Sequence, residues 1–353
     1  MEKFNREMLS LARDYRGFTQ GELEAQSGVS QSLISKAEHG LLDPSDDALQ
    51  RLAKALNFPA KFFLEPGRRV GLPHFHAQQR SRVPAKSLAR IEAFINIRRR
   101  HVSKLLRSYD LTAPKPIPQI DLDETGLTPE RVASRLREYW LIPRGPVPSV
   151  TEIIEDAGGV VILSRFGTNL LDGLSIRSEG LPPLFFMNRD VSGDRFRFSL
   201  ARELGHLVLH SLPEDDERME AEAHRFASAF LMPRDDVRPY FMDSKLSTFA
   251  KIKAFWKVPI RELIDRSHDL ELMTDYQYKA LTTQYNKTFR EVEPVEVPLE
   301  VPTTVRKMVR YHLERLGYSV GELATMLCVE EEQLQQAYLD KPRLRVVSSN
   351  DDA

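Results

Sequence analysis

The sequence predicts a multidomain, mostly α-helical protein. It has a five-helix N-terminal domain, then an α+β domain with a small sheet, then a helical C-terminal region. Apolar residues recur with helical spacing along most of the 353 residues, which is enough chain for two or three domains. Only the stretch 159–189 differs: it holds three short apolar runs separated by turn residues, and these predict strands.

Composition excludes several classes of protein. The hydrophobic fraction is 41% and the charged fraction 29%, as in ordinary globular proteins. No apolar run approaches the roughly 18 residues that a membrane span needs, and the first ten residues lack the apolar core of a signal peptide. The single cysteine, Cys328, cannot form a disulfide within the chain. We therefore expect a cytoplasmic protein without a membrane partner.

Turn-rich and charged stretches suggest where the domains end. The segment 111–127 is rich in proline, and 290–303 alternates valine with acid and proline. The predicted segments are the five-helix domain 1–66, a basic helical connector 67–110, a Pro-rich linker 111–127, the α+β domain 128–240, a helical extension 241–289, a linker 290–303 and a C-terminal helical segment 304–345.

Positive charge is concentrated in the connector. The net charge of the chain is −1, yet residues 67–108 hold eleven Lys and Arg residues and a single acid, Glu92. Such a block is typical of a surface that contacts a phosphate backbone. The alternative is a solvated basic helix, because apolar residues in 84–108 also have helical spacing.

The most specific motif is "GFTQGELEAQSGVSQSLISKAEHG" at 17–40. Thr19 followed by Glu22 is a capping box that begins a short helix, and Gly28 provides the turn that ends it. Ser30 is the N-cap of a second short helix. Two short helices joined by a glycine turn predict a helix-turn-helix unit, whose second helix enters the major groove of DNA.

Residues 5–64 resemble the lambda-repressor-like (Xre) helix-turn-helix family, because T-Q-x-E-L, G-V-S and I-S-K-x-E-x-G follow in order. The resemblance implies that Gln20 holds a phosphate and that four polar residues face the groove, namely Gln31, Ser32, Ser35 and Lys36. Glu24 departs from the small alanine usual at its position. The alternative is a helical bundle that binds protein.

The family's use of paired half-sites implies that the chain binds operator DNA as a homodimer.

A second motif bears on the rest of the chain. "SLARELGHLVLH" at 199–210 fits the zinc-peptidase pattern H-E-x-x-H at every position except the first. Glu203 stands where the general base would be and His206 where the second ligand would be, but Arg202 replaces the first ligand.

This motif and the later "EAEAHRFASAFLMP" resemble the ImmA/IrrE metallopeptidase family over residues 128–240. The family pattern is F-x-x-A-H-E-x-G-H-x-x-x-H followed by E-A-N-x-F-A-x-x-L-M-P, and His224 replaces its asparagine. The resemblance implies a zincin-like fold in which His206 and Glu222 are zinc ligands and Glu203 is the general base.

Arg202 argues against a working metal site. A guanidinium has no lone pair, stays protonated and repels a dication. The favoured hypothesis is that Arg202 pairs with Glu222 or Glu203, which replaces one cation by another and leaves no zinc and no peptidase activity.

Two alternatives remain open. Zinc is still held by His206, Glu222 and a substitute such as His224 or His210, or no metal site ever existed and this helix is simply core.

The C-terminal region repeats part of the N-terminal motif. "GYSVGELATMLCVEEEQL" from Gly317 aligns with "GFTQGELEAQSGVSQSLI" from Gly17, although chance similarity of two short helices is the alternative. Glu330, Glu331 and Glu332 stand where groove-facing residues would begin. Because phosphates repel carboxylates, we expect this segment to pack or bind a partner instead of DNA.

Together these patterns predict a transcription regulator whose peptidase-like domain senses a small-molecule or protein effector. One alternative is a zinc endopeptidase that cleaves a partner repressor. A second is a protein-binding module of the antitoxin or immunity type.

Overall fold

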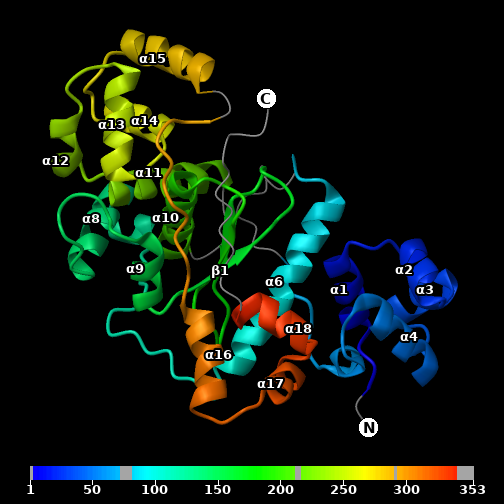
Figure 1. Ribbon diagram of the computed structural model, residues 1–353. Helices are drawn as coiled ribbons and strands as arrows, with labels where there is room; N and C mark the ends of the chain where they lie inside the picture. Colours follow the sequence, from blue (N-terminus) through cyan, green and yellow to red (C-terminus); the bar gives the residue numbers. More distant parts are fainter. Residues whose placement is uncertain (1–2, 72–81, 211–215, 290–291, 340–353) are drawn as a thin grey trace, which may run out of the picture. The chain divides into compact units, whose positions relative to one another are not determined.

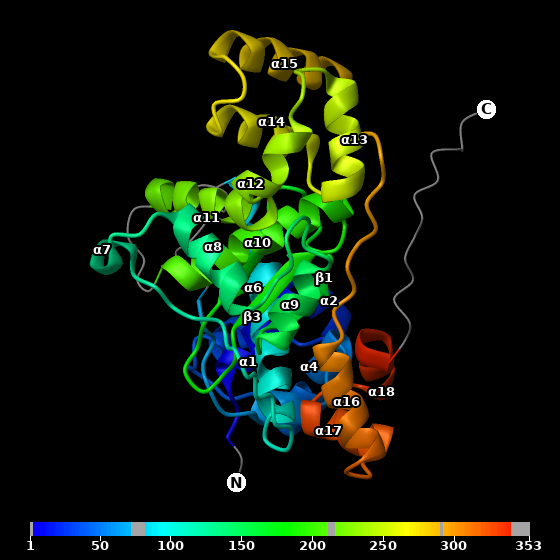
Figure 2. The ribbon, with the colours of Figure 1, turned by 90° about the vertical axis from the view of Figure 1, so that its left-hand side faces the viewer.

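The computed structural model describes residues 3–71, 82–210, 216–289 and 292–339. The chain forms two compact units. Unit 1 combines the chain up to Arg69, the segment Arg100–Tyr109 and the chain from Val305 onward, and unit 2 combines Val70–Arg99 with Asp110–Thr304. Helix α6 (Ala85–Leu105) therefore begins in unit 2 and ends in unit 1. Figures 1 and 2 show the helices and the sheet.

The N-terminal part of unit 1 contains the five predicted helices. They are α1 (Arg6–Arg16), α2 (Gln20–Ser27), α3 (Gln31–Glu38), α4 (Asp46–Leu56) and the 3-10 helix η1 (Ala60–Leu64). Thr19 and Glu22 form the predicted capping box at the start of α2. Gly28 ends α2 with a φ of 67°, a left-handed conformation that glycine adopts without steric cost. Ser30 accepts a hydrogen bond from the backbone of Leu33 and so begins α3.

The C-terminal part of unit 1 is also helical, as predicted. It consists of α16 (Thr304–Glu314), α17 (Val320–Leu327), α18 (Glu331–Leu334) and the π-helix η3 (Gln335–Leu339).

The three predicted strands form one small sheet in unit 2. They are β1 (Val160–Ser164), β2 (Gly173–Ile176) and β3 (Leu184–Asn188), in the order β1-β3-β2. The central strand β3 pairs with β1 in parallel and with β2 in antiparallel orientation. The α+β architecture predicted for this region is confirmed.

Helices make up the rest of unit 2. They are α7 (Leu122–Thr125), α8 (Pro129–Tyr139), α9 (Val150–Asp156), α10 (Gly193–Leu209), α11 (Asp216–Leu231), α12 (Arg234–Val237), the 3-10 helix η2 (Arg238–Tyr240), α13 (Leu246–Trp256), α14 (Ile260–Asp269) and α15 (Asp275–Thr288). The predicted helical extension 241–289 shares its core with the α+β region, since Phe249 and Trp256 belong to the same buried cluster as Phe185 of β3.

Helix α10 is the central helix of unit 2, and it contacts α11 together with strands β2 and β3. Gly205 allows the close approach of α11, because a Cβ atom there would lie 3.0 Å from the ring of Phe226 and 3.2 Å from the backbone of Ala223. This contact fixes which residues of α11 face the motif on α10.

Both segments predicted as linkers are packed parts of unit 2 instead of free chain. In 111–127, Ile117 is buried and the backbone of Ile120 donates a hydrogen bond to the carbonyl of Val208. In 292–304, Glu300 accepts hydrogen bonds from the backbone of Thr151 and from Arg197. Proline and turn residues indicate irregular backbone, and irregular backbone can still be packed.

The pairing of Glu300 with Arg197 gives a testable expectation. Arg197 is 1% exposed and also donates to the carbonyls of Val147 and Pro148, so its charge depends on Glu300 for balance. We expect Glu300→Gln to lower the free energy of unfolding by about 2 kcal/mol.

Urea unfolding of the full chain checks this value. The isosteric control is Glu296→Gln, four residues away at an exposed position, where a change below about 0.5 kcal/mol is expected. Equal effects of the two substitutions would contradict the assignment.

Candidate functional site

The first turn of α3 presents polar side chains to solvent. Ile34 is completely buried and fixes the inner face of the helix. On the opposite face Gln31, Ser32 and Lys36 are exposed, and Ser35 is partly exposed. The four residues predicted to face the groove therefore share one accessible helix face, which is the arrangement that base-edge contact requires.

Gln20 lies at the start of α2 but is engaged within the domain. Its side-chain amide donates to Glu38 Oε2 at 2.7 Å, and Glu38 also accepts from Arg13 Nε at 2.6 Å. Its role as a phosphate clamp remains a prediction. Sequence reasoning missed the Arg13–Glu38 pair, which links α1 to α3. Glu38 is the acidic residue of the motif I-S-K-x-E-x-G, but nothing in the sequence indicates that Arg13 is its partner.

Several cations of the basic connector serve contacts inside unit 1. Arg69 pairs with Asp14 at 2.6 Å, and Lys104 pairs with Glu65 at 2.8 Å. Arg100 donates to the carbonyl of Pro66. Part of the predicted phosphate-contacting charge is thus already balanced, and Arg80 lies outside the described residues.

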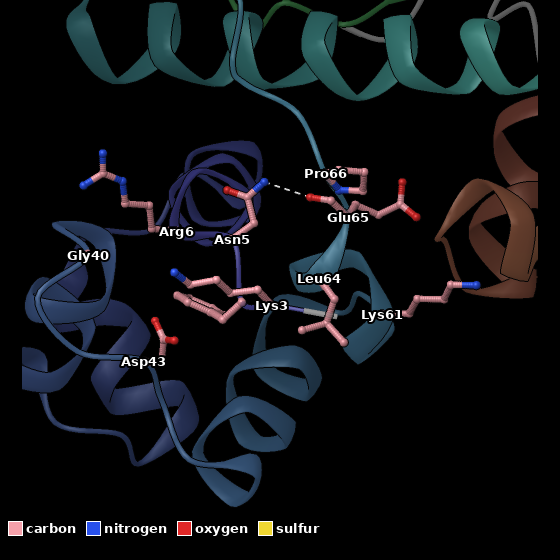
Figure 3. Close-up of a pocket in the computed structure, with 10 residues that line it drawn as sticks. Lys3, Asn5, Arg6, Gly40, Asp43, Lys61, Leu64, Glu65 and Pro66 are labelled. Carbon is pink, nitrogen blue, oxygen red and sulfur yellow. Dashed lines mark hydrogen bonds between the residues drawn. The ribbon is translucent and has the colours of Figure 1, made fainter. Parts of the chain in front are cut away.

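A cavity of about 720 Å³ lies in unit 1 between the start of α1, the loop after α3, and η1 (Figure 3). Asn5 spans one side and donates to the carbonyl of Glu65 at 2.8 Å. The charged residues that line this open cavity are of both signs: Lys3, Arg6, Lys61, Asp43 and Glu65. This mixture favours no particular ligand.

The zinc-peptidase-like motif lies on α10 in unit 2. Glu203 and His206 are each 0% exposed. Glu203 Oε2 accepts a hydrogen bond from Ser175 on β2 at 3.0 Å. The predicted general base is therefore present, buried and oriented by the sheet.

Arg202 contacts two carboxylates. Its Nη2 atom lies 3.8 Å from Glu203 Oε1, and its Nη1 atom lies 3.5 Å from Glu220 Oε2. His206 Nε2 lies 3.5 Å from the other oxygen of Glu220. The predicted pair with Glu203 occurs, while Glu220 takes the place expected for Glu222.

Glu222 faces a different set of partners. It lies 3.1 Å from His210 Nε2 and 2.9 Å from Arg218 Nε. His210 Nδ1 in turn lies 3.2 Å from His206 Nδ1. Burial and the neighbouring His206 lower the pKa of His210 to about 4, against the opposing effect of Glu222.

His224 points to α14 instead of to this cluster. Its Nε2 atom lies 2.8 Å from Glu262 Oε2. Burial lowers the pKa of His224, but the hydrogen bond and charge of Glu262 outweigh it and raise that pKa above its usual value. The structure does not bring His224 to His206 as a substitute ligand.

These residues do not fit a catalytic zinc ion. Within the described ranges, no group of three or more His, Cys, Asp and Glu side chains is arranged to hold a metal. The Arg202 guanidinium stands between Glu203 and Glu220, where it would repel a dication.

Comparison with known families supports the two-part organisation. Residues 9–63 match the helix-turn-helix family, and residues 154–268 match the IrrE N-terminal-like domain family. The chain therefore contains an Xre-type helix-turn-helix domain and an IrrE/ImmA-like domain, and the latter match extends through α13 into α14. A search of curated proteins gave no match. None of the described helices combines the length and apolar character needed to cross a membrane.

Proposed function

We propose that the protein is a sequence-specific transcription regulator that binds operator DNA through α3. The observation that supports this most is the exposed polar first turn of α3 on a helix-turn-helix whose other face is buried. Gln31 has the bidentate amide that pairs with adenine, and Lys36 suits guanine or phosphate. Two chains would bind paired half-sites, about 34–36 Å apart or a multiple of it.

We infer that the IrrE-like domain senses an effector without cleaving peptides. Hydrolysis by Glu203 would need an activated water beside its carboxylate, and metal binding is the usual source of that water. Here the Glu203 carboxylate has Arg202 and Ser175 beside it. A fixed guanidinium preserves the charge balance of the cluster without Lewis-acid chemistry.

Selection of duplexes from a random DNA pool tests the proposed function. Full-length protein should enrich one sequence motif, and protection from nuclease should span two half-sites. Binding that depends only on salt and enriches no sequence would overturn the proposal.

A zinc endopeptidase is the second candidate, because Glu203 and His206 are retained and Glu220 lies 3.5 Å from His206. This geometry predicts that Arg202→His creates a site with His206 and Glu220, and that the variant takes up about one zinc ion per chain.

Elemental analysis after dialysis measures that uptake. In the Arg202→His background, Glu220→Gln should abolish zinc uptake, while Glu222→Gln serves as the matched control and should retain it. If Glu222→Gln abolishes zinc uptake and Glu220→Gln retains it, then Glu222 completes the site. Chelator-sensitive cleavage of a partner repressor by the unmodified protein, abolished by Glu203→Gln, would favour the endopeptidase.

A further inference from the structure

Two segments of unit 1 correspond residue by residue over their whole length. Positions 6–34 and 306–334 align without a gap, with a constant separation of 300 positions. The correspondence includes α1 with α16 as well as α2 with α17. Seven pairs are buried in both segments: Met8 and Met308, Leu9 and Val309, Ala12 and His312, Leu23 and Leu323, Ser27 and Leu327, Val29 and Val329, and Ile34 and Leu334.

The ends of α2 and α17 correspond as well. Helices α2 and α17 each begin with a capping box and each end on a left-handed residue. These are Thr19–Glu22 with Ser319–Glu322, and Gly28 with Cys328. Cys328 has a φ of 57°, a conformation that side chains other than glycine and asparagine rarely adopt. Cys328 thus has the same backbone conformation as Gly28 at the same aligned position, which is consistent with a shared fold.

We propose that residues 304–339 are a second helix-turn-helix copy that does not contact DNA and instead stabilises the first copy. Its α18 begins with the exposed carboxylates of Glu330, Glu331 and Glu332, at the positions of Ser30, Gln31 and Ser32. Phosphates repel three adjacent carboxylates, so this helix is unsuited to the major groove.

The second copy contacts the end of the first copy's helical core. Gln333 Nε2 on α18 donates to the carbonyl of Asn57, the residue that ends α4, at 2.8 Å. Cys328 Sγ lies 3.3 Å from Glu65 Oε1, just after η1. These contacts confirm the expectation that the segment packs, and they join residues more than 260 positions apart.

The last turns of α6 join the two copies. Lys104 Nζ lies 2.8 Å from the carbonyl of Met326 on α17 and 2.8 Å from Glu65 Oε2. One turn earlier, His101 Nδ1 lies 2.6 Å from the hydroxyl of Tyr338 on η3, and both side chains are buried. Lys104 therefore bonds to both copies through one ammonium group.

What the second copy implies for DNA binding rests on the proposed function, that of a regulator that binds operator DNA. If the second copy does not bind DNA, each chain supplies a single recognition helix, and an operator with two half-sites needs two chains.

Hydrogen exchange of the full-length protein tests the stabilising role without any DNA. The double variant Lys104→Met with Gln333→Ala removes contacts between the copies but leaves the core of each intact. We expect amide protection at Leu52, Leu56 and Phe63 to fall at least tenfold. The matched control is Arg107→Met with Gln336→Ala, which changes exposed residues just after the end of α6 and on η3 and should leave this protection unchanged.

Two results would overturn the proposal. The first is loss of protection confined to 304–339, with α4 and η1 unaffected. The second concerns the charge of α18. The double variant Glu331→Lys with Glu332→Lys should leave affinity for the selected duplex unchanged within about twofold. A large gain in affinity would place α18 at the DNA and overturn the proposal. Because the exchange measurement needs no DNA, it remains valid if the regulator assignment fails.

Discussion

Replacing Gln31 and Lys36 together by alanine is expected to weaken binding to the selected duplex by at least a hundredfold. A good side-chain contact to a base edge contributes about 1–3 kcal/mol, and about 1.4 kcal/mol corresponds to a factor of ten. Both side chains are exposed, Gln31 at the start of α3 and Lys36 in its last turn, so the substitutions leave the core of the domain intact. Fluorescence anisotropy at one fixed salt concentration measures the loss.

Lys54→Ala is the control for charge. Lys54 is exposed on α4 and has the same charge as Lys36, but it lies outside the predicted recognition face. Its loss should weaken specific and random duplexes equally and by less than about tenfold. If Lys54→Ala and Lys36→Ala have the same effect, and Gln31→Ala has none, then α3 does not determine specificity.

Arg202→Met is expected to destabilise unit 2 by about 3 kcal/mol, because removal of one member of a buried charge cluster leaves the others uncompensated. Glu203 is 0% exposed, and the Arg202 side chain is only 16% exposed. Urea unfolding followed by the near-ultraviolet signal of the tryptophans measures the change, since Trp140 and Trp256 are both in unit 2.

Two further variants isolate the cause. Arg218→Met removes an arginine that is 45% exposed and should have a much smaller effect on stability than Arg202→Met. In a Glu220→Gln background, the effect of Arg202→Met should shrink, because the two charges balance each other. An undiminished effect would mean that the pair with Glu220 does not contribute to the stabilisation by Arg202.

Local signals in the sequence were sufficient for most of the fold. The capping box at Thr19, the turn at Gly28 and the N-cap at Ser30 define the helix-turn-helix before any tertiary contact is known. The three strands were predicted because short apolar runs lie between turn residues. These features depend on neighbours in the chain, so a single sequence contains them.

Long-range contacts were not predictable in the same way. The register of α11 on α10 decides whether Glu220 or Glu222 approaches Arg202. The contact of Gly205 with Ala223 determines that register. The segment around Glu300 was predicted as a linker because valine alternates there with acid and proline, and its partner Arg197 lies 103 positions away. Similarly, nothing local indicates that Lys104 bonds to both helix-turn-helix copies.

The zinc content of the full-length protein, purified without chelator, tests most directly whether Arg202 stands in place of a metal. We expect well below one zinc ion per chain, together with sequence-specific DNA binding that a chelator does not change. Stoichiometric zinc in the unmodified protein would contradict it, because His206 and its neighbours would then bind the ion despite the guanidinium, and the endopeptidase would become the favoured function.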